Sequence, residues 1–225
     1  MTSEQYKKSA KTLLLFLIII YIVLFSVKLF ILKDNPFPLI KKIMKGELTK
    51  LPPDPMYLFD YFLYMSLAFT FLPLPTLPVT IFMGKTFMPL QVALIGAVGT
   101  TLANLNDYCI VSTIFISKKV QKIHTTKFYN FLIRNFDKYP FLIVTIGTFV
   151  PIPIDFVRLL AISHQYPVAK YSLANFVGRF PRYYLLAMFG YAFQISNKAI
   201  LIIFAIFLLL SYLLKRWTSR KNALS

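Results

Sequence analysis

Charged side chains within apolar segments are the residues of this chain best suited to chemistry. Arg179 and Arg182 are three residues apart, and Asp155 and Arg158 repeat this spacing, which would place each pair on one face of a helix. A charge at the centre of a membrane helix costs about 2.5–3.5 kcal/mol on an insertion scale, so a functional role is the first hypothesis. Guanidinium groups bind phosphate through bidentate contacts. The three arginines therefore predict a site for an anionic lipid headgroup.

Other polar residues could complete this site. Asp155 could neutralise Arg158, which is the favoured role, or could be a protonation site that couples transport to a proton gradient. Asn104, Asn106 and Asp107 form a polar cluster in another apolar run, where a purely structural helix would carry leucine, and we expect them to line the same cavity. In the alternative interpretation, the arginines extend to the lipid–water interface or satisfy carbonyl groups of broken helices.

The remaining reactive residue types argue against an enzyme. His124 and His164 are isolated from each other and from any carboxylate at metal-ligand spacing, and the single cysteine, Cys109, lies in an apolar run. No glycine-rich phosphate loop or nucleophile motif occurs in the sequence. We therefore expect no enzymatic activity, no metal and no other cofactor.

The composition indicates an integral membrane protein. Of 225 residues, 57% are hydrophobic and only 15% are charged, and the mean hydropathy is +0.65. Several stretches approach the roughly 20 apolar residues that a helix needs to cross a bilayer. The net charge of +17 comes from Lys and Arg residues that lie mostly between apolar runs, as in loops facing anionic lipid headgroups. We therefore expect lipids as partners and no nucleic acid.

The apolar runs divide the chain into three parts. Residues 1–55 are predicted to hold a transmembrane helix at 12–32, with Lys28 reaching the interface, and a short interfacial helix. Residues 194–225 are predicted to hold a C-terminal transmembrane helix and a basic tail. Residues 56–193 form the predicted core: a first hairpin at 56–84, a helix at 89–116, a surface helix at 117–139, a second hairpin at 140–165 and a helix at 168–193.

Prolines break two of the apolar segments at matching places. Residues 70–75 read TFLPLP and residues 148–153 read TFVPIP, and the same offset of 78 relates Pro89 to Pro167. Proline removes a backbone donor and restricts the residue before it, so a helix is interrupted there. Such paired interruptions are typical of inverted-repeat transporters, although simple kinks in two spanning helices are the alternative. The prolines assigned to the re-entrant hairpins are Pro73, Pro75, Pro78, Pro151 and Pro153.

A topology with both termini in the cytoplasm makes these repeats inverted. The first hairpin then opens outside and the second opens inside. The inside carries more Lys and Arg than the outside under this assignment, in agreement with the positive-inside rule. The small size and the Lys-, Phe- and Ile-rich composition favour a prokaryotic plasma membrane.

The second half contains the motifs FVPIPID at 149–155 and GRFPR at 178–182. With these motifs the chain resembles the DedA / VTT-domain superfamily, also called SNARE-associated Golgi proteins. This resemblance covers about residues 56–193 and implies two opposed membrane-embedded hairpins with adjacent spanning helices. It also implies lipid movement, by phospholipid scrambling in eukaryotic members and recycling of polyprenyl phosphate in bacterial members. The motifs that carry the resemblance are FVPIPID at 149–155, Ala161, Pro167, Phe176, GRFPR at 178–182 and Gly190, joined in the first half by Gly84, Gly96, Gly99 and Asp107-Tyr108.

The chain departs from this family pattern at two places. Many bacterial members carry an acidic residue in or beside the first hairpin and an arginine directly before the Phe of the second. This chain has Thr76 after Pro75 and Thr148 before Phe149. These differences argue against a proton-coupled mechanism built on those residues.

Together these observations predict an all-α integral membrane protein with an inverted repeat of two re-entrant hairpins, each followed by a spanning helix, and one further transmembrane helix at each end. Its predicted function is a flippase or scramblase for an anionic lipid such as a phospholipid or polyprenyl phosphate. The alternatives are a secondary transporter of a small solute or ion and a non-transporting membrane scaffold. Homo-oligomerisation is left open.

Overall fold

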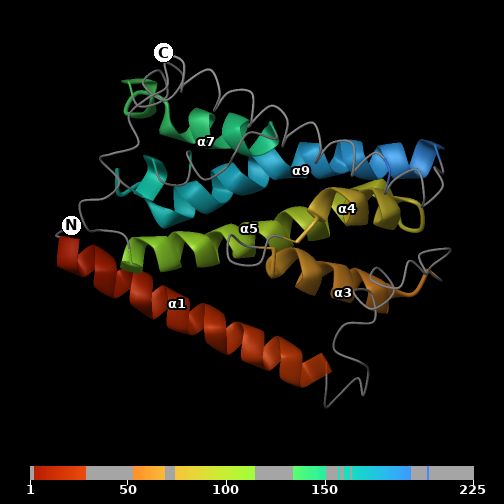
Figure 1. The fold of residues 1–225 in the computed structure, drawn as a ribbon, viewed down its shortest axis with the longest axis horizontal. Helices are drawn as coiled ribbons and strands as arrows, with labels where there is room; N and C mark the ends of the chain where they lie inside the picture. Colours follow the sequence, from red (N-terminus) through yellow and green to blue (C-terminus); the bar gives the residue numbers. More distant parts are fainter. Residues whose placement is uncertain are drawn as a thin grey trace, which may run out of the picture.

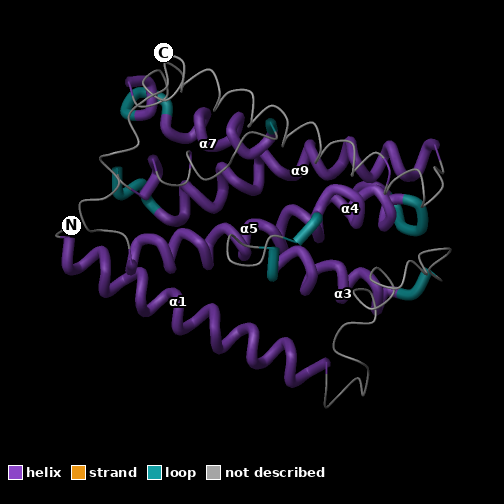
Figure 2. The backbone as a smooth tube through the Cα atoms, viewed as in Figure 1, coloured by secondary structure: helices purple, strands orange, loops and turns teal. Residues whose placement is uncertain are grey.

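Every regular element in the described part of the chain is a helix (Figures 1 and 2). The computed structural model describes residues 3–28, 53–68, 74–114, 134–150, 157, 160–162, 164–193 and 202. The all-α prediction is thus confirmed for these residues. The helices are α1 (Ser3–Ser26), α3 (Pro55–Ser66), α4 (Thr76–Gly84), α5 (Pro89–Ile114), α7 (Pro140–Phe149) and α9 (Val168–Phe193).

Several predicted elements lie outside the described residues. They are the interfacial helix after α1, most of the surface helix at 117–139, the turn of the second hairpin, and the C-terminal helix and tail, of which only residue 202 is described.

The helix α1 contains a long apolar stretch. Its stretch Lys8–Ser26 has a hydropathy of 2.3, and only 11% of it is buried within the molecule. Within the described ranges, it is the one helix that is both long and apolar enough to cross a membrane. The helices α5 and α9 have 26 residues each, so they extend over about 39 Å and exceed the hydrocarbon thickness of about 30 Å.

Two short antiparallel helices, α3 and α4, form the first hairpin (Figure 1). The Tyr61 hydroxyl is 2.9 Å from Thr80 Oγ1, and the Tyr64 hydroxyl donates to the Pro75 carbonyl at 3.2 Å. Later residues of α3 therefore meet earlier residues of α4. The two helices have 12 and 9 residues, which correspond to about 18 Å and 14 Å, so neither covers the hydrocarbon thickness alone.

The ends of these short helices follow from local sequence. Asp54 caps α3 because its carboxylate accepts a hydrogen bond from the Met56 amide at 2.9 Å. Pro55 occupies the first turn, where a backbone N–H would have no partner within the helix, so the missing N–H of proline costs nothing. Pro75 has an extended backbone (φ −73, ψ 92) immediately before α4, and Pro78 lies in the first turn of α4. Both prolines thus lie at a helix start, where proline is tolerated.

The antiparallel pair α5 and α9 forms the centre of the molecule, with α3 packed on α5 and both α4 and α7 packed on α9 (Figure 1). One hydrophobic cluster joins α3 and α4 to the beginning of α5 and the end of α9. A second cluster joins α7, Val157 and residues 160–162 to the end of α5 and the beginning of α9. Fully buried side chains include Tyr61, Met65 and Met83 in the first cluster and Tyr108, Phe136 and Tyr171 in the second.

Glycines allow the backbones of α4 and α9 to touch. A Cβ atom at Gly190 would overlap the Ile81 carbonyl oxygen, and one at Gly84 would overlap the Ala187 carbonyl oxygen. Because the obstructing atoms are backbone atoms, they cannot move aside as a flexible side chain could. The first hairpin is therefore fixed against α9 without intervening side chains.

The prediction that Lys28 reaches the interface is wrong in this structure. Lys28 is fully buried and forms an ion pair with Asp60 of α3. Ala10 and Leu17, which are also buried, precede Lys28 at intervals near whole helical turns, so all three side chains lie on one side of α1. The lysine is on the inner side of α1, where an acidic partner is available.

A larger side chain at Gly190 should loosen this fold. We expect Gly190→Val to lower the stability by about 1–3 kcal/mol, the usual effect of overpacking, and therefore to lower the melting temperature in detergent. The matched control is Ala192→Val, because Ala192 is exposed on the same helix. Equal melting temperatures for the two variants would contradict the close packing of α4 on α9.

Candidate functional site

Three buried polar side chains connect α5 and α9 near the middle of both helices. The Asn104 amide donates to Asn175 Oδ1 at 2.6 Å, and Arg179 Nη2 donates to Asn104 Oδ1 at 3.0 Å. The Asn175 amide donates in turn to the Tyr171 carbonyl at 2.7 Å. We call Asn104, Asn175 and Arg179 the central polar cluster.

Helix geometry explains how these residues meet. Asn175 and Arg179 are four residues apart on α9, so both project from one face of that helix. Asn104 contacts both from the facing helix, with its amide nitrogen on Asn175 and its oxygen on Arg179. An asparagine side chain carries both a donor group and an acceptor. Asn104 therefore has its orientation fixed by Asn175 and offers its acceptor to the guanidinium.

The guanidinium of Arg179 is buried beside neutral groups. The side chain is 6% exposed, and its Nη2 atom donates a hydrogen bond to the neutral amide of Asn104. Its Nε atom is also buried and has no hydrogen-bond partner among the described residues. A buried donor on a cation would form a strong, charge-assisted hydrogen bond with an anionic oxygen. The arrangement is therefore chemically suited to bind an anion.

The second arginine of the pair lies at the end of α7. Arg182 is half-buried, and its Nη1 atom donates to the Thr148 carbonyl at 3.4 Å. Thr148 precedes the last residue of α7, and Val150 after it has an extended backbone (φ −77, ψ 138). In this structure Arg182 thus satisfies a carbonyl at a helix end, as the alternative interpretation of the arginines required.

The polar cluster of α5 divides between two faces of the helix. Asn106 donates to the Tyr21 hydroxyl of α1 at 2.8 Å, whereas Asn104 faces α9. Residues two positions apart in the sequence project about 200° apart around the helix axis. Asn104 and Asn106 therefore point to nearly opposite sides of α5. In this structure Asn106 thus faces α1, and its expected place beside the cavity stays a prediction. Asp107 is fully buried on α5, one turn from Asn104.

One histidine is closer to a carboxylate than its place in the sequence indicates. His164 Nε2 is 3.5 Å from Asp137 Oδ1, and its ring lies tilted against the Phe136 ring, with 5.0 Å between the ring centroids. This pair connects the turn before α7 to the turn before α9. The described part of the chain holds no group of three or more His, Cys, Asp or Glu side chains that could bind a metal ion.

Some predicted site residues remain predictions because they lie outside the described residues. These are Asp155, Arg158, Pro73, Pro151 and Pro153.

Sequence reasoning missed Asn175, the residue that orients Asn104. The available signal was its position four residues before Arg179, on the same helical face and within an apolar stretch. Polar residues four positions before or after a buried arginine share its helical face, so they are candidates for the same polar cluster.

The contact between the two asparagines should appear as energetic coupling. We expect Asn104→Ala and Asn175→Ala to destabilise the protein by about 1–3 kcal/mol each, because each leaves a buried polar group unpaired. The double variant should lose less than the sum, with a coupling of about 0.5–3 kcal/mol. Unfolding titrations of the four proteins in mixed micelles measure this coupling, and additive effects would contradict the contact.

Comparison with known proteins identifies the family of this chain. Residues 74–192, which are more than half of the sequence, match the VTT domain. No curated protein matches the chain, and no solved structure matches it. The matched residues include α4, α5, α7 and α9, and with them the whole central polar cluster. The chain therefore belongs to the VTT-domain family, the DedA family of membrane proteins.

Proposed function

We propose that this protein moves a lipid with an anionic headgroup across the membrane. The observation that carries the proposal is the buried Arg179 guanidinium, whose Nε has no partner among the described residues. A phosphate oxygen would supply both the acceptor and the negative charge that this group lacks. The VTT domain supports a membrane protein linked to lipid or solute transport.

The surroundings of Arg182 favour a lipid over a free anion. Phe149 and Val150 follow directly after the Thr148 carbonyl that Arg182 contacts, and both are exposed. An exposed apolar surface beside polar groups suits a molecule whose tail stays in the bilayer while its headgroup enters the protein. We infer that a headgroup passes Arg182 before it reaches Arg179.

An internal repeat would provide matching halves for this path. Gly99 and Gly178 each lie ten residues after the first residue of α5 and α9, respectively. A Cβ atom at Gly99 would lie 2.9 Å from the Phe62 carbonyl oxygen of α3, and one at Gly178 would overlap the Thr145 carbonyl oxygen of α7. Each long helix thus contacts the helix at the start of its own half through an equivalent glycine. The two glycines are 79 residues apart, one more than the offset of 78 that relates the prolines, so they support a two-fold repeat with a shift of one residue between the halves.

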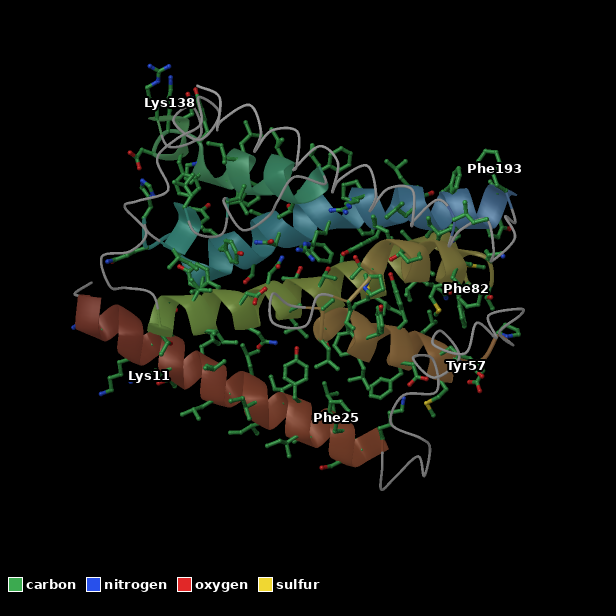
Figure 3. The ribbon with its side chains drawn as sticks, viewed as in Figure 1. Lys11, Phe25, Tyr57, Phe82, Lys138 and Phe193 are labelled. Atoms are coloured by element: carbon green, nitrogen blue, oxygen red, sulfur yellow. The ribbon has the colours of Figure 1, made fainter. Side chains whose placement is uncertain are left out.

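The charges support an orientation in which the two halves are inverted. Lys11 and Lys138 lie at one end of the molecule, and Phe82 and Tyr57 lie at the other (Figure 3). Exposed Lys170, at the beginning of α9, adds to the basic end. By the positive-inside rule, the basic end faces the cytoplasm. The short helices α3 and α4 then form a re-entrant hairpin that opens on the opposite side, and the protein is multi-pass with a cytoplasmic N-terminus.

Cysteine labelling tests this orientation. In a Cys109→Ser background, Lys138→Cys should react with an impermeant maleimide only from the cytoplasmic side, because it lies at the basic end. Met88→Cys, in the exposed turn between α4 and α5, should react only from the other side. Sealed vesicles of known orientation provide the measurement, and labelling of both positions from one side would contradict the inverted arrangement.

Lipid translocation in proteoliposomes tests the function. We expect Arg179→Gln to slow movement of headgroup-labelled phosphatidylglycerol by about 10–100-fold, because a hydrogen bond to a charged group contributes about 1.5–3 kcal/mol. The matched control is Lys170→Gln, which removes an exposed cation from the same helix. A labelled polyprenyl phosphate, assayed in parallel, distinguishes a carrier lipid from ordinary phospholipids.

Two outcomes would count against the proposal. Folded wild-type protein that moves no lipid would exclude translocation and leave solute transport or a scaffold role. Equal slowing by Arg179→Gln and Lys170→Gln would exclude the central polar cluster as the headgroup site.

A further inference from the structure

The helix α1 lies outside the residues that match the VTT domain, yet it contacts the first hairpin at two places. Lys28 forms a buried ion pair with Asp60 of α3, and the exposed fractions of the two side chains are 0% and 2%. The Tyr21 hydroxyl donates to the Ser66 carbonyl at 2.8 Å and accepts a hydrogen bond from Asn106 of α5 at 2.8 Å. Polar contacts thus attach α1 near the middle of α3 and at its last residue.

These polar contacts differ from the packing on the other sides of the hairpin. On those sides α4 touches the backbone of α9 through Gly84 and Gly190, and the backbone of α3 approaches α5 at Gly99. Backbones in direct contact can separate only by disrupting the core. By contrast, α1 packs mainly along α5 (Figure 1) and reaches α3 through the two polar contacts. Of the helices beside α3, α1 is therefore the one that can withdraw without disturbing glycine-mediated packing.

A buried ion pair also contributes little to holding two helices together permanently. Burying two charges carries a desolvation penalty, and apolar residues of similar size often hold helices together equally well. An ion pair can exchange its partner for water or for a charged ligand once it is exposed. The Lys28–Asp60 pair is thus suited to a contact that opens and closes.

The first hairpin carries buried hydroxyl groups. Tyr61 and Thr80 share a hydrogen bond between α3 and α4, and the Tyr64 hydroxyl donates to the Pro75 carbonyl. These groups lie on the first hairpin, whereas Arg179 and Arg182 belong to α9. Tyr61 and Thr80 are fully buried, so a headgroup could reach their hydroxyl groups only if a helix beside α3 moved away.

We propose that α1 is a releasable latch on the first hairpin. When the Lys28–Asp60 and Tyr21–Ser66 contacts break, a lateral path for a lipid headgroup opens between α1 and α3. This inference rests on the proposed lipid translocation and adds to it the place where the lipid passes the first hairpin.

Reversible tethering tests the latch. In a Cys109→Ser background, Lys28→Cys and Asp60→Cys remove the ion pair, and a bifunctional methanethiosulfonate reagent then joins the two positions covalently. We expect the untethered double variant to move lipid about threefold faster than its parent, because the closed population falls. Tethering should reduce translocation well below that of the parent, and a reducing agent should restore it. The single variant Lys28→Cys, treated with the same reagent, controls for modification alone.

A second variant tests the latch independently, in case the double variant does not fold. Tyr21→Phe removes only the hydroxyl, which contacts Ser66 of α3 and Asn106 of α5, and it should also speed translocation while the protein elutes as a single species. Tethered protein that moves lipid as fast as untethered protein would overturn the latch.

A distance measurement separates failure of the latch from failure of the proposed function. Nitroxide labels at Val23→Cys of α1 and Leu58→Cys of α3, measured by double electron–electron resonance, report the separation of the two helices without any lipid transport. The latch predicts a second, longer distance whose population rises in Asp60→Asn. A single unchanged distance would overturn the latch even if lipid moves, whereas two distances without lipid movement would retain the latch and reject translocation.

Discussion

Backbone groups cannot remain without hydrogen bonds in a hydrocarbon environment, and this constraint determines much of the molecule. Both helix-breaking segments leave carbonyl groups at a helix end within the protein. The Ser66 carbonyl at the end of α3 accepts a hydrogen bond from Tyr21, and the Thr148 carbonyl near the end of α7 accepts one from Arg182. One hairpin is thus completed by a neutral phenol and the other by a cation. The positive charge needed for an anionic headgroup is consequently concentrated on the α7–α9 side.

The pair α5 and α9 combines tight packing with buried polarity. Apolar clusters enclose each end of the pair, and the central polar cluster lies between them. In a surrounding of low polarity, the hydrogen bonds among Asn104, Asn175 and Arg179 are strengthened, and so is the penalty for any group left unpaired. A site built in this way holds its guanidinium in one orientation before any ligand arrives. Such preorganisation reduces the free energy that binding must spend on ordering side chains.

Sequence patterns predicted the helices better than the contacts between them. The helix expected at 168–193 has those bounds in the structure, and the one expected at 89–116 is described as far as Ile114. Proline chemistry likewise indicated the interruption before α4. Spacing along a helix tells which residues share a face, but it does not tell which other helix that face meets. For this reason the burial of Lys28 against Asp60 was missed, and so were the partners of Asn106 and Asn175.

The boundary of the matched domain passes through the first hairpin, because α4 lies inside residues 74–192 and α3 lies outside them. The docking of α4 on α9 belongs to the part shared with the family, whereas α3 needs to match α1, which is also outside it. Because Lys28 and Asp60 form an ion pair, a substitution at one should accompany a substitution at the other. The helices α1 and α3 should then vary together among relatives, while the central polar cluster is retained.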